Sequence, residues 1–156
     1  MATEKAMNGG KVMRIISVLA KFGKKLSLST LPFAINEINW AHYAVPTISE
    51  LVDGIDYCLT KGLVIITDSD EIQPTLAASH IAKNGLLNAM GIALEYISIV
   101  NDGELSYENF LDNNNDAILF AVFSAGFTEN DIGQVKELLL KWHCIRLTSI
   151  DTVIVE

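Results

Sequence analysis

The side chains best suited to metal binding or nucleophilic chemistry are three histidines and two cysteines. His42, His80 and His143 lie far apart in sequence, and none has a partner at the spacing of a metal-binding motif. Cys58 and Cys144 form no Cys-x-x-Cys pair, so neither a zinc site nor a redox motif is expected. The sequence therefore predicts no metal and no cofactor. Two isolated cysteines also favour a reducing, cytoplasmic location.

Residues 112–116, with the sequence DNNND, begin like the calcium loop of an EF-hand. That loop needs glycine at its sixth position and glutamate at its twelfth, where this chain has Ala117 and Phe123. A hydrated loop is the better interpretation. The sequence also contains no Gly-x-Ser-x-Gly, no P-loop and no Gly-x-Gly-x-x-Gly. We therefore expect a protein that is not an enzyme.

Charge is unevenly distributed along the 156 residues, whose net charge is −8. The first 25 residues hold six basic and one acidic side chain (6 − 1 = +5), and the remainder holds five basic and 18 acidic ones (5 − 18 = −13). A body of that sign repels phosphate backbones and attracts cationic partners. The longest purely apolar run, 117–123, is too short to span a membrane, and no signal peptide is recognisable. We expect no membrane partner.

Apolar residues at helical spacing predict a first helix from residue 11 to residue 22. Residues 1–10 are polar and end in Gly-Gly, so we expect them to be disordered. Basic side chains occupy the face opposite the apolar residues, and we expect this face to lie in water. Its members are Lys11, Arg14, Lys21 and Lys25. Binding of an anionic lipid or a nucleic acid by this face is the alternative. Pro32, two residues after Thr30, marks the start of a second helix.

A capped helix followed by a hairpin is predicted between residues 47 and 75. Thr47 and Glu50 form a capping box at the start of the helix, and Gly62 follows its end. Apolar residues recur at helical spacing and should form the buried face: Ile48, Leu51, Val52, Ile55, Cys58 and Leu59. The β-branched run 63–67, an acidic turn and a short second strand complete the hairpin.

The second half of the chain echoes this pattern. Residues 75–100 are predicted to be helical with a break at Asn84-Gly85, and a turn-rich boundary with a short helix at 107–111 follows. The run 117–123 fits a strand or a buried helix equally well. Another capped helix and one or two strands then repeat the earlier helix and hairpin at a constant offset of 81 residues. Both a repeat and a chance similarity remain open.

The predicted order of elements in residues 11–75 is helix, helix, capped helix, glycine, strand, acidic turn and strand. This order resembles the winged-helix family. Residues 38–75 resemble small bacterial winged-helix proteins, through Asn39, Ala44, Pro46, Thr47, Glu50, Leu51, Leu59, Gly62, Leu63 and Val64. The resemblance implies an α+β, mostly helical fold with a small β-hairpin. We expect a winged-helix-like subdomain over 11–101 and a helix and strand subdomain over 102–156, which a second, degenerate winged helix would explain.

In winged-helix proteins that bind DNA, the resemblance places the 47–60 helix in the major groove and the hairpin nearby. The expected outward positions of that helix are Ser49, Glu50, Asp53, Asp56, Tyr57 and Thr60. None is an Arg, Lys, Asn or Gln, the residues that read bases and anchor phosphates. The hairpin turn is also acidic. This face should repel DNA.

Two functions follow from these observations. The first is a non-catalytic intracellular module whose acidic surface binds a basic protein, for example an immunity protein that neutralises a nuclease-like toxin. The predicted contacts are Glu50, Asp53, Asp56, Asp68, Asp70 and Glu71, with Trp40 and Tyr43 as aromatic anchors. The alternative is a winged-helix transcription regulator, in which the basic faces of two chains converge in a homodimer.

Overall fold

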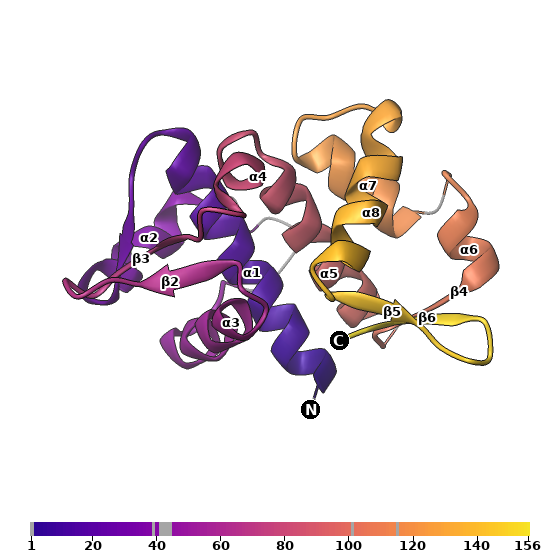
Figure 1. Cartoon of the computed structure of the whole chain (residues 1–156), viewed down its shortest axis with the longest axis horizontal. Helices are drawn as coiled ribbons and strands as arrows, with labels where there is room; N and C mark the ends of the chain where they lie inside the picture. Colours follow the sequence, from indigo (N-terminus) through magenta and orange to yellow (C-terminus); the bar gives the residue numbers. More distant parts are fainter. Residues whose placement is uncertain (1, 39, 41–44, 101, 115) are drawn as a thin grey trace.

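The computed structural model describes residues 2–38, 40, 45–100, 102–114 and 116–156 (Figure 1). The chain is mostly helical with two small antiparallel sheets, which confirms the predicted α+β class. The helices are α1 Ala2–Lys21, α2 Leu31–Ala34, α3 Ile48–Thr60, α4 Ser79–Lys83, α5 Leu86–Val100, α6 Tyr107–Leu111, α7 Asp116–Ser124 and α8 Ile132–Lys141, with 3-10 turns at Leu28–Thr30, Ile35–Glu37 and Glu129–Asp131. The strands are β1 Leu26–Ser27, β2 Val64–Ile66, β3 Glu71–Pro74, β4 Glu104–Ser106, β5 Ile145–Leu147 and β6 Thr152–Val155.

Helix α1 begins at Ala2, so the prediction that residues 1–10 are disordered is wrong for the residues that the structure describes. Its two consecutive glycines are sites of close helix packing. A Cβ on Gly9 would lie 2.1 Å from the Tyr57 ring, and a Cβ on Gly10 would lie 2.6 Å from the Gly91 carbonyl oxygen. The absence of side chains lets α3 and α5 approach α1 closely, and this packing orders the start of the chain.

The basic face of α1 is not uniformly in water, as the sequence had suggested. Lys11 and Arg14 are buried because α3 and α5 pack on α1 and bring carboxylates to it. The Arg14 Nη1 atom lies 2.9 Å from the Oε1 atom of the fully buried Glu95. Burial raises the pKa of Glu95, and the charge of Arg14 opposes that rise. Of the predicted basic face, Lys21 and Lys25 are exposed.

The two sheets have the same topology. Strand order is β1-β3-β2 in one and β4-β6-β5 in the other, and every pair is antiparallel. The bounds of β5 and β6 follow those of β2 and β3 by a constant 81 residues (145 − 64 and 155 − 74). Asp70 and Asp151, also 81 residues apart, occupy the left-handed region at φ 58° and 59°. The structure thus contains the repeat that the sequence left open.

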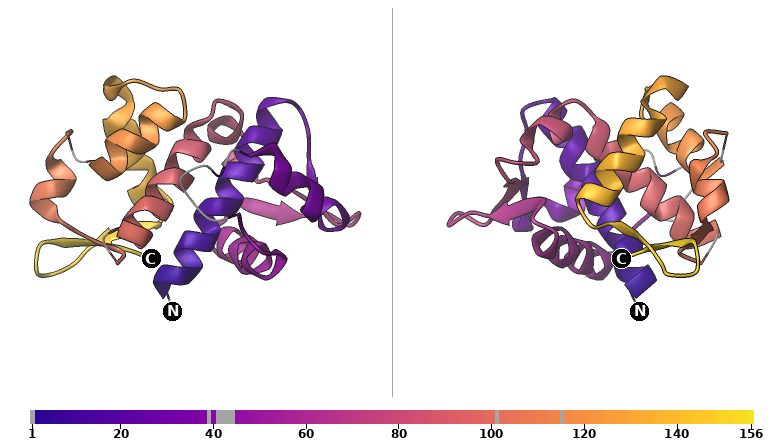
Figure 2. Two further views of the ribbon diagram at one scale, coloured as in Figure 1. Left: turned by 180° about the vertical axis from the view of Figure 1, so that it is seen from behind. Right: turned by 45° about the vertical axis from the view of Figure 1, so that its right-hand side comes forward.

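Equivalent glycines of the two units meet where their first helices cross. Gly10 and Gly91, 81 residues apart, face each other where α1 crosses α5, and these helices lie side by side in both views (Figures 1 and 2). In the repeat α5 corresponds to α1, so the second unit begins at α5. By the repeat, the two units meet between Lys83 and Leu86, which is a different division of the chain from the predicted subdomain boundary at residue 101.

Several local predictions are also decided. The break at Asn84-Gly85 separates α4 from α5, with Gly85 at φ 90°. The short helix at 107–111 is α6, and the ambiguous run 117–123 lies within helix α7.

One core cluster includes residues of both units, so the units are packed together. No helix in the described part of the chain is both long and apolar enough to cross a bilayer.

Candidate partner-binding face

Helix α3 and the β2–β3 hairpin form one end of the first unit, where α3 lies beside β2 (Figures 1 and 2). The predicted capping box is present: Thr47 Oγ1 accepts the Glu50 N–H at 3.1 Å, and Glu50 Oε1 accepts the Thr47 N–H at 2.9 Å. The bond from Thr47 lowers the pKa of Glu50, and the ammonium group of Lys11 acts in the same direction. The start of α3 is therefore fixed in position.

The three carboxylates of α3 do not form an unpaired acidic face. Lys5 of α1 pairs with Asp56, and its Nζ atom lies 3.9 Å from Asp53. Asn8 Nδ2 donates to Asp53 at 3.0 Å. Lys11, the next basic residue of α1, lies 3.2 Å from Glu50. Side chains of α1 thus compensate the charges that the sequence had assigned to a partner.

The hydrogen bond between Lys5 and Asp56 is the main cause of the raised pKa of Lys5. Asp53 and Asp56 still reach solvent, with 39% and 61% of their side chains exposed. A partner that contacts Asp53 or Asp56 would have to compete with Lys5 for these carboxylates. Charge attraction from α3 alone is therefore weak, as expected for exposed ion pairs in water.

The aromatic residues predicted as contacts are not available as a pair. Trp40 is only 7% exposed, and its Nε1 donates to the Ile35 carbonyl oxygen at 2.8 Å. The Arg14 guanidinium carbon lies 4.6 Å from the Trp40 ring centroid. Trp40 is thus a core residue, while Tyr43 lies outside the described residues. Tyr57, predicted to face outward, is buried against Gly9.

The hairpin turn retains its acidic character. Asp68 and Asp70 are exposed and Glu71 is half-buried. The turn closes through the Thr67 N–H, which donates to the backbone carbonyl oxygen of Glu71 at 2.8 Å. Within the described part of the chain, no basic side chain pairs with these carboxylates. The hairpin tip therefore offers negative charge that intramolecular contacts do not compensate.

Exposed apolar side chains are the main feature that the sequence analysis missed. Each residue of this set keeps between 37% and 52% of its surface exposed: Ile48, Val52, Leu59, Ile65 and Ile66. The first three were predicted to be buried. Helix α3 is turned because α1 crosses it at Gly54, where a Cβ would lie 2.2 Å from the Asn8 carbonyl oxygen. We call this set the apolar face: its members come from the neighbouring elements α3 and β2, and Ile65 and Ile66 point to opposite sides of β2. Exposed apolar side chains of this kind mark interaction sites.

The repeat provides an internal comparison for the apolar face. Position by position, the second unit has Glu129, Gly133, Leu140, Arg146 and Leu147 in place of the five residues. Three of its apolar side chains are thus absent from a unit of the same topology. The fold does not require an apolar residue at those positions.

Neither cysteine thiol is exposed at this face. Burial raises the pKa of both thiols, to about 11 for Cys144, and the Cys58 sulfhydryl donates to the Gly9 carbonyl oxygen at 3.6 Å. No cluster of three or more His, Cys, Asp or Glu residues that could hold a metal occurs among the described residues.

What the arrangement offers is a contact surface with an acidic rim. No family model, no curated protein and no solved structure matches this chain.

Proposed function

We propose that this chain is a non-catalytic protein-binding module built from two winged-helix-like units, and that it binds its partner through the apolar face of the first unit. The observation that carries the proposal is the exposure of Ile48, Val52 and Ile65, whose counterparts in the second unit are Glu129, Gly133 and Arg146. Exposed apolar side chains that a fold does not need, on two neighbouring elements, are typical of a site that a partner covers.

Charge indicates the chemistry of the partner. Residues 1–83 hold eight basic and eight acidic side chains (8 − 8 = 0), whereas residues 86–156 hold three and eleven (3 − 11 = −8). Close to the apolar face, the uncompensated carboxylates are those of the hairpin tip, Asp68, Asp70 and Glu71. We therefore expect a protein with an apolar contact area flanked by basic residues. A nuclease-like toxin is one instance of that class, contacted through the hairpin and not mainly through α3.

Duplex DNA is a poor fit to the same face. Helix α3 contains no Lys or Arg, and the hairpin tip is acidic, so this surface supplies no phosphate neutralisation. A transcription regulator would need its cations elsewhere. Binding to duplex DNA would distinguish such a regulator from a protein-binding module.

The test is affinity capture from the native host with two matched double variants. Ile48→Glu with Ile65→Arg places the second unit's residues on the apolar face. Leu140→Glu with Leu147→Arg makes the same chemical changes at exposed positions of α8 and β5. We expect wild type and the second variant to retain the same protein, and the first variant to lose it while keeping its melting temperature.

Equal retention by both variants would contradict the proposal, and so would equal loss. Binding to duplex DNA would favour the regulator instead, if its affinity fell steeply between about 50 and 200 mM salt. Such a fall requires on the order of six or more phosphate contacts.

A further inference from the structure

The end of α1 carries a second surface, distinct from the apolar face. Lys21, Phe22, Lys24 and Lys25 follow one another there, and Phe33 of α2 lies close by. Phe22 and Phe33 are 69% and 72% exposed. Lys21 lies ten residues beyond Lys11, the last residue of α1 that pairs with α3, which is about 15 Å along the helix. The two surfaces can therefore be tested separately.

Folding does not use these lysines. The last carbonyl groups of α1 are capped by backbone, because the Lys24 N–H donates to Leu19 at 2.8 Å and the Gly23 N–H to Ala20 at 3.1 Å. Gly23 has φ 69°, as this type of helix end requires. Within the described residues no carboxylate pairs with Lys21, Lys24 or Lys25, in contrast to the basic residues earlier in α1.

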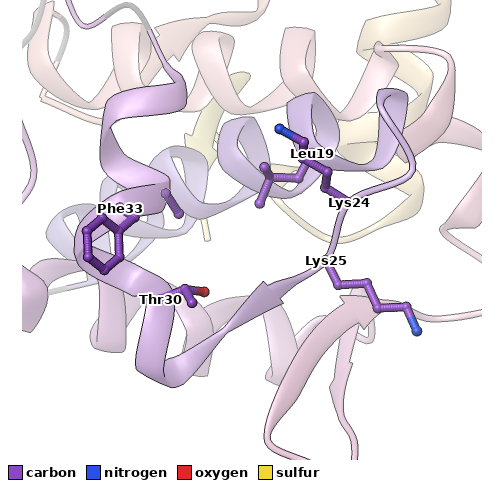
Figure 3. A pocket seen from close by; sticks show the side chains of 6 residues that line it. Leu19, Lys24, Lys25, Thr30 and Phe33 are labelled. Carbon is purple, nitrogen blue, oxygen red and sulfur yellow. The ribbon is translucent and has the colours of Figure 1, made fainter.

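An open pocket of about 130 Å³ lies between the end of α1 and α2 (Figure 3). Its floor is apolar and fixed, since Leu19 and Ala34 are each only 6% exposed. Phe33 and Thr30 form one side, and Lys24 and Lys25 the other. The pocket is smaller than the several hundred Å³ of pockets that enclose a whole drug-sized ligand. Its volume and lining suit one small apolar group with anionic groups beside the two lysines.

We propose that this pocket binds a base of a single-stranded nucleic acid, which stacks on Phe33 while Lys24 and Lys25 contact the phosphates on either side. Aromatic rings beside a basic track are how proteins hold single strands without reading sequence. The two lysine side chains leave the backbone in different directions, Lys24 past Leu19 and Lys25 away from Phe33 (Figure 3). That arrangement suits two successive phosphates better than one isolated anion.

Fluorescence anisotropy of a labelled 12-nucleotide oligo(dT) tests the site. Two lysine–phosphate contacts give a logarithmic salt slope of about −1.4, so the affinity should fall about sevenfold between 50 and 200 mM salt. Lys24→Gln with Lys25→Gln should remove most of that salt dependence. Phe33→Ala should weaken binding by about 5- to 150-fold without changing the slope, because a stacked base carries no net charge.

Two matched controls change exposed residues of the same types elsewhere. Lys141→Gln and Phe123→Ala should keep the wild-type affinity and slope. The proposal is overturned if no binding occurs at 50 mM salt, or if the lysine and phenylalanine variants bind as wild type does. Retention on vesicles rich in phosphatidylglycerol, without oligonucleotide binding, would identify a lipid surface instead. None of these results depends on the apolar face, so the proposed function stands or fails separately.

Discussion

Replacing Gly54 by alanine tests the crossing of α1 and α3, which determines the side of α3 that faces solvent. The added Cβ would lie 2.2 Å from the Asn8 carbonyl oxygen and 2.6 Å from the carbonyl carbon. Both atoms belong to the backbone of α1, so no change of rotamer relieves the clash. The helices must separate by about 1 Å before the contact becomes ordinary. The same separation would loosen the packing around Gly9 and Tyr57.

Two opposing terms set the magnitude. Overpacking of this kind costs typically about 1–3 kcal/mol and sometimes more. Alanine in place of glycine within a helix contributes about 1 kcal/mol in the other direction. Because the clash is with backbone, we expect the upper part of the range and a net loss of about 2 kcal/mol. For a chain of this length that corresponds to a melting temperature about 4–8 °C lower.

Gly133 provides the matched control, because it is an exposed helical glycine of α8 with no atom within 4 Å of its added Cβ. Gly133→Ala should gain only the higher helix propensity of alanine, so its melting temperature should be about 2–4 °C higher. Thermal unfolding followed by circular dichroism measures both variants. If Gly54→Ala melted at or above the wild-type temperature, α1 would not cross α3 at Gly54, and the apolar face would lose its basis.

Three other measurements follow from the buried and charged groups. Arg14→Met should cost about 3–5 kcal/mol in urea unfolding, because it leaves Glu95 buried without its cation, and adding Glu95→Leu should recover part of that loss. Because the pKa of Glu50 is lowered in the folded state, its carboxylate stabilises the fold above the unfolded pKa, and this stabilisation is lost as the pH falls through the folded pKa. Glu50→Gln should therefore flatten the decline in the free energy of unfolding between about pH 5 and pH 3. Cys58 and Cys144 should react with a thiol reagent only after unfolding, and rapid labelling of the native protein would contradict their burial.

Local signals in the sequence were enough to predict much of the fold. Thr47 with Glu50 and Thr128 with Asp131 form the predicted caps, because capping depends on residues only three positions apart. Gly85 marks the break between α4 and α5. The constant offset of 81 residues also pointed to the repeat, although the sequence alone could not separate repetition from coincidence.

Contacts between distant segments could not be predicted in the same way. By local propensity Gly9 and Gly10 indicate a frayed terminus, and only the approach of α3 and α5 makes them sites of close packing. The ion pair of Lys5 with Asp56 joins residues 51 positions apart, so no helical periodicity reveals it. The acidic candidate site was therefore identified by residue type, but the pairing of its carboxylates with lysines of α1 was missed, and the burial of Trp40 was missed for the same reason.

The two ends of the chain meet at Gly103. A Cβ there would lie 2.8 Å from Thr3 Oγ1 and 2.9 Å from Val155 Cγ2, and Figure 1 shows both termini on the same side of the molecule. A short linker could therefore join them without disturbing either sheet. Opening the chain at Gly85 would then give a circular permutant with its two units in reverse order and every helix crossing kept. The fold therefore needs the two units to be joined at one of these two places, and either place can carry the connection.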